Sequence, residues 1–223
     1  MKTIKIIKIK KIWVIAILSI FSLTACDTRT TYEIKSSFKT RVKENEIKEG
    51  INYTKLKKPI KDAKNITLFF WYGSESSFIL EDMLIKWLNE KEVNKLPSIN
   101  IIPGISNPLW ETPAKIYETL SYFKKNNELS EDLYKHFIIN KKISNEELLQ
   151  ILAKHKIDTI GFQEIYSSNE LMKKIDDDKS IGEQAELIYV PSVIINGVYQ
   201  IDIFSFNSFY DVFVAIDFLL NKK

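Results

Sequence analysis

The hydrophobic pattern predicts β-strands near the start and near the end of the chain. Residues 66–72 (ITLFFWY) form a continuous apolar and β-branched run, as in a strand that is buried on both faces. Residues 193–195 and 198–201 flank Asn196-Gly197, the dipeptide typical of a type I′ hairpin turn. A shorter run at 99–102 (INII) fits a further strand.

Between and after these runs, apolar residues recur at helical spacing. Residues 77–90 place most of their apolar side chains on one face, and the tail 207–220 has a similar pattern. Further helices are expected to open at Thr112-Pro113, at Ser130-Glu131, at Ser144 with Glu147 in a capping box, and at Asp158-Thr159 with an end near Ile175. The acidic triplet 176–178 is most simply a solvated turn.

The order of these elements indicates the fold class. A strand, a helix and a strand come first, a helical block follows near 107–187, and a hairpin and a helix close the chain. This order predicts an α/β core interrupted by an all-helical insertion. The 223 residues are enough to bury a core of ordinary size.

The formal charge of the chain is +3, but this excess comes from its first 25 residues. They contain five lysines and no acidic residue, so 32 basic residues less these five leaves 27, against 29 acidic ones. The basic excess therefore gives no support to nucleic-acid binding. The chain has one cysteine, Cys26, which excludes an internal disulfide and a Cys-rich metal site.

The same 25 residues have the pattern of a secretory signal peptide. A lysine-rich start precedes the apolar residues 12–21, a run shorter than the roughly 20 residues of a membrane-spanning helix. The sequence Leu23-Thr24-Ala25-Cys26 then resembles the bacterial lipobox, in which cleavage falls before the cysteine and its sulfur carries lipid. The alternative is a simple signal peptide with an incidental cysteine.

These features predict a bacterial envelope protein that is lipid-anchored on the periplasmic side of a membrane. Asp27, directly after Cys26, resembles a signal for retention in the inner membrane. Residues 26–50 are polar and lack a clear period, so we expect a tether. The alternative is a short helix or strand docked on the domain.

Two groups of residues resemble the DsbA family of periplasmic oxidoreductases over roughly residues 48–223. The first group is Glu49-Gly50, Tyr53-Thr54, Leu56, Lys58-Pro59, Ala63 and Phe69-Phe70; the second is Val190-Pro191, Ile195-Asn196-Gly197, Tyr199-Gln200, 211–214 and 221–223. The resemblance implies a thioredoxin-like fold with an inserted all-helical domain, in agreement with the order of elements. We therefore expect a thioredoxin-like domain at 51–106 and 188–223, and a helical insertion at 107–187.

The active-site positions depart from the family. The family has Cys-Pro-His-Cys at the start of a helix, where this chain has Ser74-Glu75-Ser76-Ser77. Many family members also have an acidic residue that helps proton transfer from the buried thiol, and Leu68 stands at that position. By this resemblance, the chain is a degenerate member without the CxxC cysteines.

The substitutions change the available chemistry. Disulfide exchange needs a thiolate nucleophile and a sulfur leaving group. Two hydroxyl groups cannot store a two-electron oxidising equivalent, and Cys26 is expected to be acylated. We therefore expect no catalytic residue and no redox turnover by this chain alone.

A hydrolase with Ser74 as nucleophile is a weaker interpretation. Such a serine needs a base, and the histidines of the chain, His136 and His155, lie on stretches with a surface pattern. Residues 73–77 also fail the G-x-S-x-G motif. The simpler interpretation is that Ser74 caps a helix and Glu75 favours the positive end of its dipole. Two distant histidines give no metal site, and we expect no metal and no cofactor.

The proline landmark points to binding. In the family, a proline with a cis peptide bond faces the helix start, and the backbone of its neighbour pairs with an extended substrate peptide. The resemblance assigns these roles to Pro191 and Val190, and strand addition of this kind needs no sulfur. Trp71, Tyr72 and Phe78 flank the degenerate site and are candidates to line an apolar groove, unless they are core residues.

We therefore predict a redox-inactive envelope lipoprotein that binds extended polypeptide or a partner protein through this groove. It would contact the membrane through lipid on Cys26 and would not bind nucleic acid. Two alternatives stay open. One is thiol:disulfide interchange as in the family, with sulfur supplied by a partner, and the other is a structural accessory lipoprotein of an envelope complex.

Overall fold

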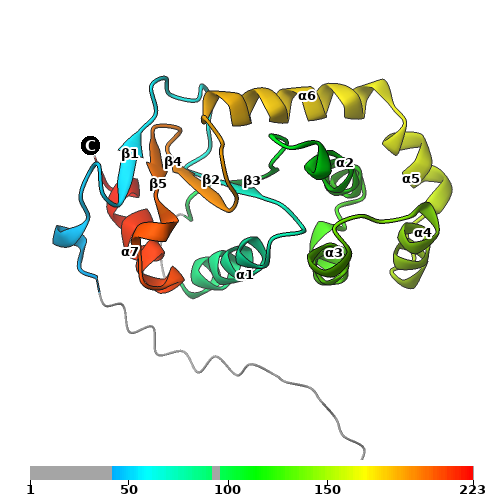
Figure 1. Ribbon diagram of the computed structural model, residues 1–223, viewed down its shortest axis with the longest axis horizontal. Coiled ribbons are helices and arrows are strands. Elements are labelled where there is room, and N and C mark those ends of the chain that lie inside the picture. The colour runs from blue at the N-terminus through cyan, green and yellow to red at the C-terminus, as the bar shows by residue number, and fades with distance from the viewer. Residues whose placement is uncertain (1–41, 92–95, 223) are drawn as a thin grey trace, which may run out of the picture. The chain divides into compact units, whose positions relative to one another are not determined.

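A five-stranded mixed β-sheet with the strand order β1-β5-β4-β2-β3 forms the centre of the protein (Figure 1). The computed structural model describes residues 42–91 and 96–222. The strands are β1 (Tyr53–Lys55), β2 (Ile66–Phe70), β3 (Ile99–Pro103), β4 (Ser192–Ile195) and β5 (Tyr199–Ile201). The sheet therefore joins segments from both ends of the chain, as the sequence pattern predicts.

Strand β2 has a partner on each side. It pairs in parallel with β3, with Phe70 opposite Pro103, and antiparallel with β4, with Phe69 opposite Ser192. All five of its residues are buried. The predicted strand with two buried faces is confirmed, although it ends at Phe70 and not at Tyr72.

Strands β4 and β5 form the predicted hairpin. Asn196 and Gly197 have φ angles of 53° and 67°, as a type I′ turn requires. The N–H of Val198 donates to the carbonyl of Ile195 at 3.0 Å. Glycine is needed at the second position for a further reason, because a Cβ atom on Gly197 would lie 2.6 Å from the carbonyl oxygen of Ile60.

The helices are α1 (Glu75–Glu90), α2 (Pro108–Phe123), α3 (Asn126–Asn140), α4 (Asn145–Lys154), α5 (Thr159–Tyr166), α6 (Asn169–Gln184) and α7 (Phe209–Leu220). Helices α1 and α7 cover one face of the sheet, where Leu84 and Ile216 share a buried cluster with Leu68. Leu187, just after α6, packs with Phe69 on the other face. Figure 1 shows α6 on the opposite side of the sheet from α1 and α7. Leu68 and Phe69 belong to different clusters because neighbouring strand residues point to opposite faces.

Helices α2 to α6 occupy the chain between β3 and β4. Tyr134 and Phe137 of α3 lie in a buried cluster of this helical region, and Phe70 joins it from the end of β2. The predicted capping box at the start of α4 is confirmed. The Ser144 hydroxyl accepts from the N–H of Glu147 at 3.2 Å, and the Glu147 carboxylate accepts from the N–H of Ser144 at 2.8 Å.

Two helices begin earlier than predicted. Helix α2 begins at Pro108 and not at residue 112, because the Asn107 side chain accepts from the N–H of Leu109 at 2.9 Å and caps the helix there. Helix α3 begins at Asn126 and not at residue 130. The extra turn carries Leu129, which is fully buried in the helical cluster.

The single helix expected after Asp158 is in fact two helices. The Ser168 hydroxyl accepts from the N–H of Leu171 at 3.0 Å, so a new N-cap starts α6 after a break. Helix α6 continues past residues 176–178, which therefore do not form the expected solvated turn. The reason for the difference is that one acid of this triplet is buried against α2.

Asp178 of α6 and Glu118 of α2 form this buried acidic pair. They are 1% and 4% exposed. Lys174, one turn earlier on α6, forms an ion pair with Asp178 and lies 3.6 Å from the carboxylate of Glu118. Burial, with the negative charge of Asp178, raises the pKa of Glu118 to about 7. Burial also raises the pKa of Asp178, so the pair holds a proton under mildly acidic conditions.

The described part of the predicted tether is docked on the domain. The N–H of Val42 donates to the Asp211 carboxylate at 3.2 Å, and Ile47 is buried in the cluster beneath α1 and α7. A short 3-10 helix, Glu44–Glu46, lies between them. Over residues 42–50 the tether prediction is therefore wrong, and the docked alternative describes the chain.

The expected signal peptide, residues 1–25, lies outside the described part of the chain. Cys26 and residues 27–41 lie outside it as well, so lipid attachment and retention by Asp27 stay predictions. None of the helices within residues 42–91 and 96–222 is long and apolar enough to cross a membrane.

The buried acidic pair predicts that Glu118→Gln changes how the free energy of unfolding depends on pH. A raised pKa means that the folded protein holds the proton more tightly than the unfolded chain. The resulting stabilisation is complete below about pH 4.5 and is lost as the pH rises through about 7. Between about pH 5 and pH 8, we expect the wild type to lose up to about 3 kcal/mol more unfolding free energy than Glu118→Gln.

Urea denaturation at several pH values measures this difference. Glu164→Gln, at an exposed position of α5, is the matched control and should keep the wild-type dependence on pH. The same dependence in Glu118→Gln as in the wild type would contradict the assignment of the proton to this pair.

Candidate functional site

The turn between β2 and α1 contains the four positions 74–77. Ser74 is the N-cap of α1, and its hydroxyl accepts from the N–H of Ser77 at 3.1 Å. The N–H of Ser74 donates to the carbonyl of Trp71 at 2.9 Å. A Cβ atom on Gly73 would lie 2.3 Å from the Trp71 ring, so the turn needs glycine there. The local sequence thus places Ser74 at the first turn of α1.

The four positions differ in exposure. Glu75 is exposed, Ser74 and Ser76 are half-buried, and Ser77 is fully buried. The Ser77 hydroxyl accepts from the N–H of Trp71 at 3.4 Å, which ties the helix to the end of β2. The hydroxyl groups of Ser74 and Ser77 therefore both accept hydrogen bonds from the backbone of the turn.

No general base lies beside the Ser74 hydroxyl among the described residues. His136 Nε2 lies 2.8 Å from the carbonyl oxygen of Lys142, and His155 Nε2 lies 2.7 Å from the Asp132 carboxylate. Both contacts lie within residues 132–155, from α3 to the residue that follows α4. Nor do three His, Cys, Asp or Glu side chains converge as metal ligands anywhere in the described chain. The arrangement thus lacks the partner that a nucleophilic serine needs.

The segment before β4 lies across from this turn. Extending the β2–β4 register by two residues places Pro191 opposite Phe70 and Val190 opposite Trp71. The Val190–Pro191 peptide bond is cis, with Pro191 buried and Val190 half-buried. Within the described residues, the N–H and C=O of Val190 have no hydrogen-bond partner. They are therefore available to an added strand.

Trp71 and Trp110 form an apolar surface beside the C-terminal end of β2. Their rings are stacked, with centroids 5.6 Å apart and planes inclined by 27°. Gly104, just after β3, lets Trp110 of α2 approach Val190. A Cβ atom there would lie 3.0 Å from the Val190 side chain and 3.1 Å from the Trp110 ring. We name the surface formed by Trp71, Trp110 and Val190 the binding edge.

Lys141 supports the turn from the end of α3. Its Nζ donates to the carbonyl of Gly73 at 2.8 Å and lies 5.2 Å from the centroid of the Trp71 ring. The sequence pattern did not identify Lys141, Trp110 and Gly104 as residues of this site. A predicted start of α2 at residue 112 left Trp110 outside the helix, and no local pattern marks a contact between residues 68 positions apart.

Two of the three aromatic residues expected to line the groove lie elsewhere. Tyr72 is 1% exposed and packs in the helical cluster, with its ring 4.9 Å from that of Tyr134 and 6.1 Å from that of Phe137. Tyr72 is therefore a core residue, the alternative that the sequence had left open beside the groove. Phe78 is half-buried, and the centroid of its ring lies 5.0 Å from that of Tyr134. It lines a separate hollow between α1 and α3. Trp71 alone of the three lies at the binding edge.

A buried carboxyl group near the site was also missed. Glu81 lies one helical turn after Ser77, is 7% exposed and accepts from the Tyr134 hydroxyl at 2.7 Å. Burial raises the pKa of Glu81, and the hydrogen bond from Tyr134 opposes this effect. Leu68, at the family's acidic position, is fully buried among apolar side chains. The available signal was the four-residue spacing that puts Glu81 on the same helix face as Ser77.

No family model matches the chain, but curated relatives match most of it. The thiol:disulfide interchange protein DsbA of Azotobacter vinelandii is 24% identical over 190 residues, which are 80% of this chain and 85% of that protein. The protein of the same name from Pseudomonas aeruginosa is 21% identical over 180 residues, 78% of this chain and 84% of that protein.

Solved structures show the same fold. The crystal structure of Pseudomonas aeruginosa DsbA has a TM-score of 0.69 at 18% identity and covers 80% of this chain and 95% of its own. A Cys-to-Ser variant of Proteus mirabilis DsbA with a non-covalently bound peptide, PWATCDS, has a TM-score of 0.68 at 17% identity and covers 79% of this chain and 99% of its own. The α/β core with inserted helices is therefore the thioredoxin-like fold in its DsbA-like form.

The relatives are named for thiol chemistry, whereas this chain has a single cysteine, Cys26. Ser74 and Ser77 lie at the start of α1, where the resemblance places the two cysteines of the family. The sequence relatives, the fold and the position of Ser74 and Ser77 all point to the same similarity with DsbA. This chain is therefore a DsbA-like protein of the thioredoxin fold in which serine occupies both cysteine positions of the CxxC motif.

Proposed function

We propose that this protein is redox-inactive and binds extended polypeptide at the binding edge. The observation that carries the proposal is serine at both 74 and 77, beside a Val190 backbone whose hydrogen-bonding groups are free among the described residues. Serine at both positions removes the exchange reaction. The free backbone supports a binding role that does not depend on sulfur.

The missing sulfur decides the reaction. Disulfide exchange proceeds by attack of a thiolate on a disulfide, with a second thiolate as leaving group. A helix N-terminus lowers the pKa of a thiol into the useful range, but the pKa of a serine hydroxyl is far too high for the same help to suffice. Ser74 and Ser77 form no S–S bond, so the turn holds no oxidising equivalent. Cys26 cannot replace them, because one cysteine makes no internal pair.

Strand addition is the binding mode that the geometry supports. Val190 supplies one N–H donor and one C=O acceptor, and the stacked rings of Trp71 and Trp110 supply an apolar surface beside them. Main-chain hydrogen bonds give affinity in such complexes, and side-chain contacts give specificity. The Proteus mirabilis DsbA variant binds its peptide non-covalently with serine in place of a cysteine, which supports peptide binding without a covalent bond here.

We further propose a location on the periplasmic side of the bacterial envelope, with a lipid anchor on Cys26. The lipobox-like residues 23–26 support the anchor, and Asp27 supports retention in the inner membrane. The resemblance to a family of periplasmic oxidoreductases supports the compartment. The partner is then an envelope polypeptide and not a nucleic acid.

Thiol:disulfide interchange is the second candidate, because the curated relatives carry that name. It would require a partner to supply both sulfur atoms, since the described residues contain no cysteine. The two candidates differ in turnover by the purified protein.

The redox-inactive proposal predicts a gain of function in the double variant Ser74→Cys with Ser77→Cys. We expect the wild type to show no insulin reduction and no oxidation of a reduced peptide above the blank. The double variant should form a disulfide and oxidise the peptide, because both thiols would then lie at the helix N-terminus. The single variant Ser74→Cys is the control and should not oxidise the peptide. Insulin reduction or peptide oxidation by the wild type above the blank would contradict the proposal.

The binding proposal predicts that affinity for a peptide does not depend on sulfur. We expect fluorescein-labelled PWATCDS and its Cys-to-Ser form to bind within about twofold of each other, because neither forms a bond to Ser74. Trp71→Ala should weaken both by about tenfold or more, as loss of an aromatic anchor does. Fluorescence anisotropy measures the affinities.

Two controls accompany this experiment. Tyr122→Ala removes an exposed aromatic ring elsewhere on α2 and should leave the affinity unchanged. Peptides N-methylated at single backbone positions should lose affinity at alternate residues, because every second residue pairs with the receptor strand. Equal binding of all methylated peptides would argue against strand addition.

A further inference from the structure

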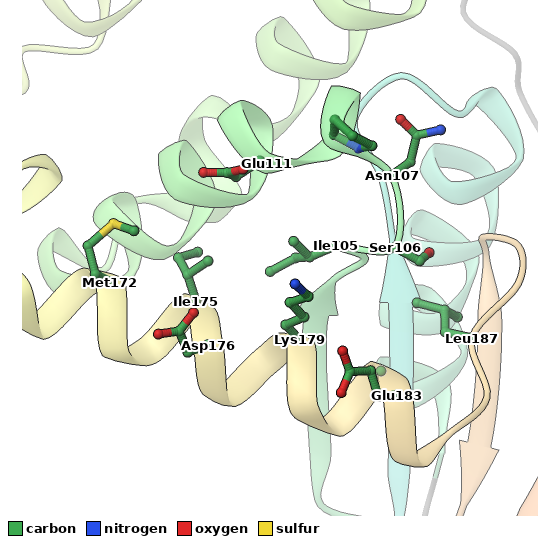
Figure 2. Close-up of a pocket in the computed structure, with 12 residues that line it drawn as sticks. Ile105, Ser106, Asn107, Glu111, Met172, Ile175, Asp176, Lys179, Glu183 and Leu187 are labelled. Carbon is green, nitrogen blue, oxygen red and sulfur yellow. The ribbon is translucent and has the colours of Figure 1, made fainter.

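A cavity separate from the binding edge lies between α6 and the segment that connects β3 to α2. It has a volume of about 460 Å³, within the roughly 300–1,000 Å³ of known ligand pockets. It shares no residue with the binding edge or with positions 74–77. Figure 2 shows side chains from the 105–111 segment facing side chains of α6 across it.

The inner part of this cavity is apolar. Ile175 and Leu187 are 4% and 9% exposed, and Ile105 is half-buried beside them. Gly182 of α6 also lines the cavity and leaves part of it unfilled. A Cβ atom on Gly182 would meet only the Leu187 side chain, at 3.6 Å, which is ordinary contact.

The rim is charged and mainly acidic. Glu111 of α2 and Asp176 and Glu183 of α6 supply three carboxylates, against one ammonium group from Lys179. All four side chains are exposed, and none has an ion pair or a hydrogen bond within the part of the chain that the structure describes. Figure 2 shows Glu111 across the cavity from the residues of α6. The rim therefore has an uncompensated negative charge above an apolar floor.

We propose that this cavity binds a polypeptide segment in which lysine or arginine side chains alternate with aliphatic ones. Lysine and arginine bury aliphatic stems along apolar surface while their charged heads stay in water. The apolar floor at Ile105, Ile175 and Leu187 matches such stems and the aliphatic neighbours. The carboxylates of the rim match the heads, and charge complementarity of this kind selects the partner.

The charge of the rim disfavours other occupants. An acidic or phosphorylated segment would meet three carboxylates, and a wholly apolar one would leave them without a partner. This inference does not rest on the proposed function, because the cavity and the binding edge have no residue in common.

The test uses a fluorescein-labelled peptide, Gly-Leu-Lys-Leu-Lys-Leu-Gly, and the purified protein, with anisotropy as the readout. Asp176→Asn with Glu183→Gln should weaken binding by about fivefold, since it removes two of the three carboxylates that would pair with the lysine side chains. The control double variant, Glu164→Gln with Glu170→Gln, removes the same charge from exposed positions outside the cavity and should bind as the wild type does.

A second variant tests the floor without changing any charge. Gly182→Met fills the cavity, keeps α6 helical because methionine is a better helix former than glycine, and should also abolish most of the binding. A peptide with glutamate in place of lysine should not bind. Far-UV circular dichroism checks that each variant is folded.

Three outcomes would overturn the proposal. The first is wild-type affinity in Gly182→Met, which would leave only a diffuse attraction of the basic peptide. The second is a loss of peptide affinity in the control double variant equal to that in Asp176→Asn with Glu183→Gln. The third is binding of the glutamate peptide as tight as that of the lysine peptide.

Discussion

Strand β2 forms hydrogen-bonded ladders on both edges, in parallel with β3 and antiparallel with β4, and all of its side chains are buried. A shift of either ladder by one residue would exchange Leu68 and Phe69 between the two faces of the sheet, so the register is strongly determined. The two registers therefore fix the position of the C-terminal end of β2 relative to β3 and β4. The register places Val190 opposite Trp71 on one side, and Gly104 follows β3 on the other. The binding edge is a consequence of this pairing.

The turn after β2 keeps its geometry without sulfur. Ser74 caps α1, and Ser77 accepts from the N–H of Trp71, so each hydroxyl satisfies a backbone donor. Orphan N–H groups at a helix start need such partners whether or not the site is catalytic. In the proposed function, serine at both positions removes the exchange chemistry of the relatives, while the helix start and the facing Val190 segment are present in the structure. This separation of scaffold from reaction underlies the proposed binding role.

Helix α6 places acids in two different environments. Asp178 faces α2, where it is buried beside Glu118 and pairs with the half-buried Lys174, so its charge is costly and the two acids retain a proton. Asp176 and Glu183 face the cavity beside β3, where they are exposed and keep no partner among the described residues. The first environment links stability to pH, and the second creates an acidic rim above an apolar floor. The helical insertion therefore contributes a surface of its own, separate from the binding edge.

The sequence by itself determined the elements that depend on near neighbours. The buried run of β2, the turn at Asn196-Gly197 and the cap at Ser144 follow from side-chain size, backbone freedom and local hydrogen bonds. The absence of a cysteine pair follows from composition alone. Helix starts were predicted less accurately, because Asn107 and Ser168 cap helices whose starts the apolar period places elsewhere. Only the tertiary structure decided which aromatic residue after β2 reaches the binding edge. Trp71 and Tyr72 are adjacent in the chain, but stacking on Trp110 and burial against α3 give them opposite environments. The partners of Asp178 and Glu81 were equally beyond the sequence, because contacts between distant segments, and not local pattern, select which charged side chains are buried.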